Sequence, residues 1–210
     1  MSLRCLSCND FAPGWVDRAT ARLGLVEDLL LICHPETPCS ALHCIDVSCD
    51  RTASGALVVQ FTAIGNIDAI IVPKPVLEVS RHDELWLTTC FEAFVKVPNN
   101  DSYTEFNFAP STGWASYSFS KYRAGMADTQ LDPPHFDVDV LEKELIVSVT
   151  IDVSKLANLP QSDIWQIALS AVIEEQDGSK SYWALNHPPG KPDFHHPDCF
   201  ALTLAPPERA

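Results

Sequence analysis

Three successive segments between Glu84 and Met126 alternate apolar and polar residues with the period of two that is typical of β-strands. Turn residues separate them, first around Asn99 and then around Gly113. If the segments are neighbouring antiparallel strands, their apolar positions share one face and form packing for a core. The positions assigned to this apolar face are Leu87, Phe91, Ala93, Val95, Val97, Phe106, Phe108, Ala115, Tyr117 and Phe119.

The opposite face of these predicted strands carries two indoles, two carboxylates and an amide, from Trp86, Glu92, Glu105, Asn107 and Trp114. Aromatic rings stack on the C–H groups of sugars, and carboxylates and amides exchange hydrogen bonds with hydroxyls. The combination predicts a surface for a saccharide-like or other small polar ligand. The alternative is a solvated sheet face with gap-filling tryptophans, although such a face usually carries more Lys and Thr and fewer large aromatics.

Three further residues are candidates for ligand contact. Arg123 follows the third alternating segment, where its guanidinium can reach a carboxylate or a ligand oxygen. The other interpretation of Arg123 is a surface residue paired with one of the many acids. Trp183 lies within a later predicted strand, 181–185, and His187 follows that strand; the two residues complete the candidate set.

The rest of the chain also consists of short apolar or alternating segments separated by turn-forming residues. No helical periodicity is long enough to cover a sheet, and no internal repeat is visible. About ten strands predict an all-β fold, an antiparallel β-sandwich of jelly-roll or immunoglobulin-like type. Outside the central segments, the predicted strands are 29–33, 42–51, 56–64, 68–72, 136–141, 144–152, 165–174, 181–185 and 201–204.

The length and the charge set limits on organisation and partners. The 210 residues suit one large β domain over 25–210, and the aperiodic residues 1–24 predict an N-terminal extension. No apolar run approaches the ~20 residues of a membrane span, and no signal-peptide core follows Met1, so we expect a cytoplasmic protein. A net charge of -14 disfavours nucleic acid and anionic membranes and suits a neutral or cationic ligand.

Cysteines and histidines raise the question of metals. Cys5 and Cys8 form a CxxC pair with no second pair at zinc-finger spacing, so the eight cysteines predict reduced thiols rather than a metal motif. The proline-stiffened segment 186–200, NHPPGKPDFHHPDCF, is typical of a functional loop. His187, Asp193 and His195 supply N and O ligands suited to zinc or a similar ion. The other interpretation is that the histidines brace the loop.

Two alternatives to simple binding remain open. A haem site would need two facing axial ligands, for which Met126 with His187 or His195 are the candidates. Catalysis would use Glu92 and Glu105 as an acid and base pair, with His187 as another base. The chain has no nucleophile elbow, phosphate-binding glycine loop or metalloprotease motif, which favours a non-catalytic protein.

Three motifs occur in order along the chain: TTCFEAFVKV, YTEFNFAPSTGWASYSFSKYRAGM and YWALNHPPGKPDFHHPDCF. Together they resemble the DOMON-like proteins of bacteria, whose sandwich is similar to family 9 carbohydrate-binding modules. The resemblance covers Leu29 to Leu204 and includes both sugar binders and b-type haem domains among the relatives. It implies that Trp86, Glu92, Glu105, Asn107 and Trp114 lie where a sugar-binding relative engages its ligand. Such modules are usually exported parts of larger enzymes, so the missing export signal favours a small intracellular ligand.

Overall fold

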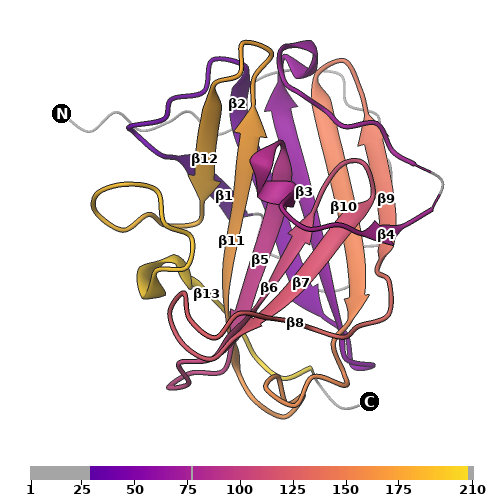
Figure 1. Cartoon of the computed structure of the whole chain (residues 1–210), viewed down its shortest axis with the longest axis vertical. Helices are drawn as coiled ribbons and strands as arrows, with labels where there is room; N and C mark the ends of the chain where they lie inside the picture. Colours follow the sequence, from indigo (N-terminus) through magenta and orange to yellow (C-terminus); the bar gives the residue numbers. More distant parts are fainter. Residues whose placement is uncertain (1–28, 77, 208–210) are drawn as a thin grey trace.

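A computed structural model describes residues 29–76 and 78–207 of the chain, so the predicted extension 1–24 lies outside the described residues. The described part is nearly all β, as predicted, with three short 3₁₀ turns as its helical elements (Figure 1). These turns are η2 (Ile67–Ala69), η3 (Leu85–Leu87) and η4 (Pro197–Cys199).

The strands form one continuous sheet of thirteen strands rather than the expected ten or so. Its first part, called the β3 half, contains β1 (Leu29–Cys33), β2 (Leu42–Arg51), β3 (Ala56–Gly65), β10 (Glu144–Asp152) and β9 (His135–Val140) in that order.

The second part, called the β5 half, continues from the other side of β1. It contains β12 (Lys180–Ala184), β11 (Trp165–Glu174), β5 (Cys90–Lys96), β6 (Tyr103–Phe108), β7 (Gly113–Phe119) and β4 (Ser80–Arg81) in that order. Two short strands extend it, β13 (Leu202–Leu204) beside β11 and β8 (Ala127–Asp128) beside β7.

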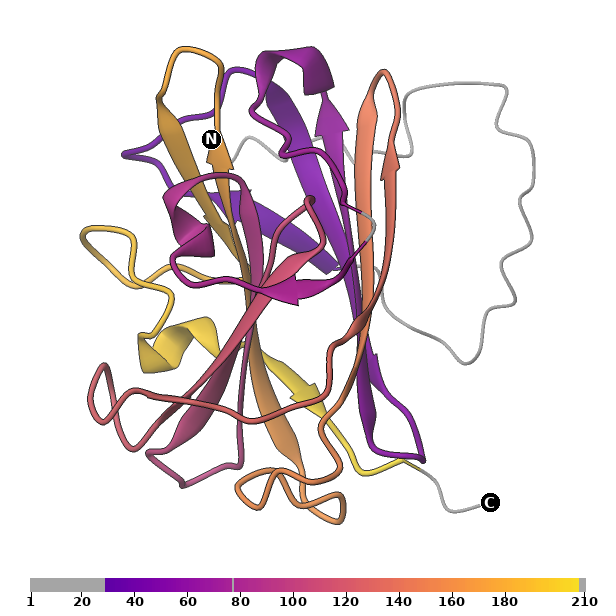
Figure 2. The same ribbon diagram turned by 45° about the vertical axis from the view of Figure 1, so that its right-hand side comes forward.

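The expected antiparallel sandwich differs from the structure in two respects. Strand β1 pairs with β2 through residues 29–31 and with β12 through residues 32–33, so the two halves belong to one curled sheet. In addition, β4 runs parallel to β7, so the sheet is mixed. The curl brings the two halves opposite each other (Figure 2).

The principal core fills the space between the halves. Phe61 of β3 stacks on Phe91 of β5 with ring centroids 4.9 Å apart. The alternation on β3 places Leu57, Val59 and Phe61 in this core, and all three side chains are at most 1 % exposed. Because burying apolar area on this scale is the main driving force for folding, the inward face of each strand fixes where its other face points.

The face assignment is correct for β5 and β6 and wrong for β7. Phe91 pairs with Phe108, and Phe108 pairs with Trp114, so Trp114 points into the principal core. Its side chain is 4 % exposed, and its indole Nε1 has no hydrogen-bond partner. The outer face of β7 instead carries Tyr117 and Phe119, which the alternation had placed inward.

Candidate functional site

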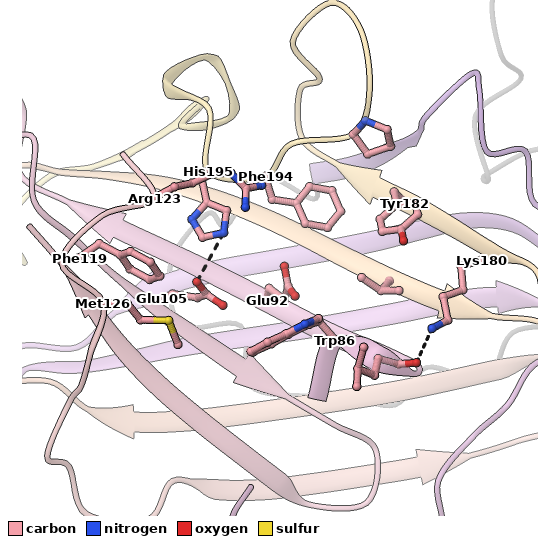
Figure 3. Close-up of a pocket in the computed structure, with 13 residues that line it drawn as sticks. Trp86, Glu92, Glu105, Phe119, Arg123, Met126, Lys180, Tyr182, Phe194 and His195 are labelled. Atoms are coloured by element: carbon pink, nitrogen blue, oxygen red, sulfur yellow. Dashed lines mark hydrogen bonds and ion pairs between the residues drawn. The ribbon is translucent and has the colours of Figure 1, made fainter. Parts of the chain in front are cut away.

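A cavity of about 460 Å³ lies on the outer face of the β5 half. Strands β5, β6, β11 and β12 provide its floor, while η3 and the segments 120–126 and 186–199 provide its walls (Figure 3). The lining residues are Trp86, Leu87, Glu92, Glu105, Phe119, Arg123, Met126, Val172, Lys180, Tyr182, Pro192, Phe194 and His195.

Glu92 lies on the floor of this cavity, in the centre of β5. It pairs with Asn107 on one side and Ser170 on the other, and its carboxylate Oε2 accepts a hydrogen bond of 3.1 Å from Ser170 Oγ. The residue is 4 % exposed. Burial, followed by the charge of Glu105, raises the pKa of Glu92 to about 8, although the Ser170 bond and the charge of Arg123 act in the opposite direction.

Glu105 is the second carboxylate of the floor and lies diagonally across from Glu92 on β6, two residues before Asn107 and on the same face. Diagonal neighbours in an antiparallel pair lie roughly 7–8 Å apart, within reach of long side chains. Its Oε1 accepts a 2.7 Å hydrogen bond from Asn107 Nδ2. Burial raises the pKa of Glu105 to about 7, against the opposing effects of Asn107 and Arg123. The pair therefore retains protons near neutral pH.

His195 reaches Glu105 from the loop above. Its Nδ1 lies 2.8 Å from the hydroxyl of Tyr103, and that hydroxyl accepts a 3.1 Å hydrogen bond from the backbone N–H of Arg123. The hydroxyl proton is then available for Nδ1, which leaves the ring proton on Nε2, 3.8 Å from Glu105 Oε2. Burial, followed by the Arg123 charge, lowers the pKa of His195 to about 4, so the ring is neutral at neutral pH.

Arg123 lies at the mouth of the cavity and is tied to the loop. Its Nη2 and Nε donate to Asp193 Oδ1 at 2.7 and 3.2 Å, and Tyr122 donates to the other carboxylate oxygen. The Tyr122 and Arg123 bonds hold the pKa of Asp193 below its usual range, although burial acts in the opposite direction. These contacts join segment 120–126 to segment 186–199 and so close one wall.

The cavity walls are rich in aromatic rings, because the outer face of the β5 half is itself a second apolar cluster. Trp86, on η3, packs edge-on against Tyr117 at 6.0 Å, and it lies across the carboxylate pair from His195 (Figure 3). Phe194 is 8 % exposed and packs near Tyr182. Both faces of β5 and β6 are therefore buried, and an apolar wall surrounds the two carboxylates.

The predicted ligand-contact residues thus separate into two groups. Trp86, Glu92, Glu105 and Arg123 line the cavity, and Asn107 lies beneath it, bonded to Glu105. The other candidates, Trp114, Trp183 and His187, are not among the lining residues.

Trp183 and His187 face away from the cavity for specific reasons. Trp183 alternates with Tyr182 on β12, so its indole enters the principal core and donates to Ser181 Oγ at 2.9 Å. His187 turns toward β1, where its Nε2 lies 2.8 Å from the carbonyl of Ile32 and its ring contacts His34 edge-on.

The predicted metal ligands do not converge. His187 contacts Ile32, Asp193 contacts Arg123, and His195 contacts Tyr103. Within residues 29–76 and 78–207, no group of three or more His, Cys, Asp or Glu side chains is placed to hold a metal ion. For the haem hypothesis, Met126 and His195 both line the cavity, but Nδ1 of His195 is bonded to Tyr103 and Nε2 faces Glu105 at 3.8 Å.

Several lining residues were not predicted. Tyr182 and Lys180 share the outer face of β12, and Phe194 comes from the proline-rich loop, of which only the histidines and Asp193 were candidates. One signal in the sequence could have indicated these aromatic walls. The loop contains Phe194 and Phe200, and segment 113–119 has aromatic residues at both its odd and its even positions. Lys180 Nζ donates to the carbonyl of Leu87 and holds η3 against β12.

Comparisons with known proteins show a similar fold in solved structures but do not assign the chain to a family. No family model matches the chain, and no curated protein matches it. Among solved structures, a candidate carbohydrate-binding protein from Bacteroides uniformis is similar with a TM-score of 0.60 and 13 % identity, over 85 % of each chain. A family 9 carbohydrate-binding module from Caldicellulosiruptor kristjanssonii, solved with glucose, is similar with a TM-score of 0.50 and 12 % identity, over 88 % of this chain and 86 % of the module. The fold is therefore similar to that of family 9 modules.

Within residues 29–76 and 78–207, no helix has the length and apolarity to cross a bilayer.

Proposed function

We propose that the chain binds a saccharide-like or other small polar ligand in the cavity on the outer face of the β5 half. The observation that carries the proposal is that Trp86 and the buried carboxyls of Glu92 and Glu105 line one cavity of about 460 Å³. Ligand sites are commonly cavities of ~300–1,000 Å³ with mostly apolar walls and a few convergent polar groups.

The arrangement suits a polyhydroxylated ring. Trp86 offers an aromatic face for C–H groups, while Glu92 and Glu105 offer hydrogen-bonding groups from the floor. The low exposure of the carboxyls strengthens such bonds, because little water competes for them. The similarity in fold to a module solved with glucose agrees with this choice of ligand class.

Tryptophan fluorescence and calorimetry with a panel of monosaccharides and disaccharides test the proposal. Trp86 is the one tryptophan within residues 29–76 and 78–207 that lines the cavity, so quenching by a bound sugar should disappear in Trp86→Ala. Trp114→Phe is the matched control, because that indole lies in the principal core. A panel with no saturable response would refute the proposal.

A second candidate function is hydrolysis of a glycosidic bond. The observation in its favour is a protonated carboxyl beside a second carboxyl in one cavity, which is the requirement for a general acid with a base or nucleophile. Nitrophenyl glycosides measure it directly. Turnover that disappears in Glu92→Gln would favour catalysis, and binding without turnover would favour the first function.

A further inference from the structure

The charge around the carboxyl pair is poorly compensated. The titratable or charged groups that face the pair are Cys90, Tyr103, Tyr117, Arg123, Asp193 and His195, with Lys180 farther along the cavity. Of these, Arg123 is the cation whose charge acts on both carboxyls, and its guanidinium is bonded to Asp193. His195 is neutral, and Lys180 is bonded to the Leu87 carbonyl at the far end of the cavity (Figure 3).

Each carboxyl group of the pair also has one oxygen without a close hydrogen-bond donor. Glu92 is 4 % exposed, and its Oε2 is bonded to Ser170. Among the described residues, no group donates a hydrogen bond to Oε1 of Glu92 or to Oε2 of Glu105, and Nε2 of His195 lies 3.8 Å from Glu105 Oε2. Two carboxylate oxygens therefore face the cavity without a close donor. Buried carboxylates normally have such donors, because an unpaired charge in an apolar site is destabilising.

We propose that the ligand carries an amino group, and that the cavity is a site for an amine-bearing saccharide whose ammonium binds between Glu92 and Glu105. The inference rests on the proposed function and names the chemical class of its ligand. An ammonium supplies the positive charge and the donors that the pair lacks. The rings of Trp86, Tyr182 and Phe194 line the same cavity, and aromatic faces attract cations.

A neutral sugar uses the site less well. Its hydroxyls can bond the carboxyls, but they cannot offset the repulsion between two buried negative charges, so the pair must remain at least partly protonated. An ammonium permits both carboxyls to ionise and forms charge-assisted hydrogen bonds, which are roughly twice as strong as neutral ones. Binding of the amine therefore releases protons from the pair, and binding of the neutral sugar does not.

Isothermal titration calorimetry with glucosamine and glucose tests the inference, since the two differ by an ammonium in place of one hydroxyl. At pH 6.5 we expect glucosamine to bind at least about tenfold more tightly. Titrations in two buffers of different ionisation enthalpy should show proton release for glucosamine alone. Glu92→Gln keeps the size of the side chain and removes its ability to ionise when the ammonium binds, so it should abolish the preference, while the exposed control Glu142→Gln should retain it.

The possible outcomes distinguish the amine preference from the proposed saccharide binding on which it rests. Tighter binding of glucosamine with proton release, lost in Glu92→Gln, supports both. Glucose binding as tightly as glucosamine, or more tightly, overturns the amine preference and leaves saccharide binding in place. If neither sugar binds at millimolar concentration and the wider panel is also silent, both are overturned.

Discussion

At the scale of single residues, the two tryptophans 86 and 114 have opposite surroundings. Trp86 is half-buried beside the cavity, and Trp114 is 4 % exposed in the principal core with its Nε1 unbonded. We expect Trp114→Ala to lower the free energy of unfolding by about 3–5 kcal/mol, because truncating a buried aromatic leaves a cavity. Trp114→Phe should cost much less, since it also removes an unsatisfied donor. Urea denaturation measures both.

The same experiment on Trp86 tests the corrected face assignment. Trp86→Ala should change unfolding by less than about 1.5 kcal/mol and abolish ligand binding, whereas Trp114→Phe should leave binding unchanged. Loss of binding in Trp114→Phe, with the fold intact, would contradict the placement of that indole away from the ligand.

Glu92 gives a prediction about pH. Its pKa is about 8 in the folded chain against ~4.3 when unfolded, so the native state holds the proton more tightly. This contribution to stability is complete below about pH 4.3 and is lost as the pH rises to about 8. Glu92→Gln has no carboxyl to titrate at this position. The free energy of unfolding of the variant minus that of the wild type should therefore rise between pH 5 and 8, by on the order of 1 kcal/mol per pH unit.

Chemical denaturation of wild type and Glu92→Gln at several pH values checks this expectation. Glu142→Gln, in the exposed turn between β9 and β10, serves as the control and should show a constant difference from the wild type. A constant difference for Glu92→Gln as well would mean that the carboxyl titrates as an ordinary exposed one.

At the scale of elements, segment 186–199 depends on Asp193. Its carboxylate accepts from Arg123, from Tyr122 and from the backbone N–H of His195, and its own carbonyl accepts from Cys199 Sγ. Because these bonds are partly exposed, Asp193→Ala should lower global stability by under about 1 kcal/mol. It should nevertheless loosen the wall that carries Phe194 and His195.

Hydrogen exchange checks the loop directly. In Asp193→Ala the amides of His195 and Cys199 should exchange faster while those of β5 and β6 keep their protection, and ligand affinity should fall several-fold. Asp177→Ala, which changes the turn between β11 and β12, is the control for any loop carboxylate. Unchanged exchange at His195 would show that the loop is held by its apolar contacts instead.

The elements also show how far local pattern can predict the site. On β5 and β6 the alternation correctly placed Glu92, Glu105 and Asn107 opposite the core, because these polar residues alternate with Phe91, Ala93, Phe106 and Phe108. On β7 both faces are buried, one in the principal core and one beneath η3 and the loops. A strand with apolar packing on both sides has no polar face that would distinguish its outward side from its inward side, so the alternation could not predict which way Trp114 points.

The predicted metal ligands His187, Asp193 and His195 do not converge, for a related reason. They lie close together in the sequence, but each side chain is bonded to a partner from another part of the chain. Ile32 lies 155 residues away from His187, and Tyr103 lies 92 residues away from His195. Contacts between residues so far apart in the sequence depend on the topology of the fold, and the composition of one loop gives no information about that topology.

At the scale of the whole molecule, most strands were predicted but their neighbours were not. The segments 29–33, 42–51 and 165–174 match strands of the structure, because each is a short apolar or alternating run bounded by turn residues. The pairing of β5 with β11 and of β1 with β12 joins strands far apart in the chain. These two pairings make the single curled sheet and put Ser170 beside Glu92, so the cavity floor itself depends on them.

The curled sheet predicts that its two halves unfold together. Phe61 of the β3 half stacks on Phe91 of the β5 half, and the described tryptophans 114, 165 and 183 all lie in the core from the β5 half. Phe61→Ala should lower the unfolding free energy by about 3–5 kcal/mol. The tryptophan fluorescence should report this loss from the opposite half, at the same denaturant midpoint as the far-ultraviolet circular dichroism. Gln60→Ala, one residue away and exposed, should move neither midpoint. If the fluorescence midpoint stayed at the wild-type value while the dichroism shifted, the two halves would unfold as independent units. The shared core would then not be the interaction that holds the halves of the sheet together.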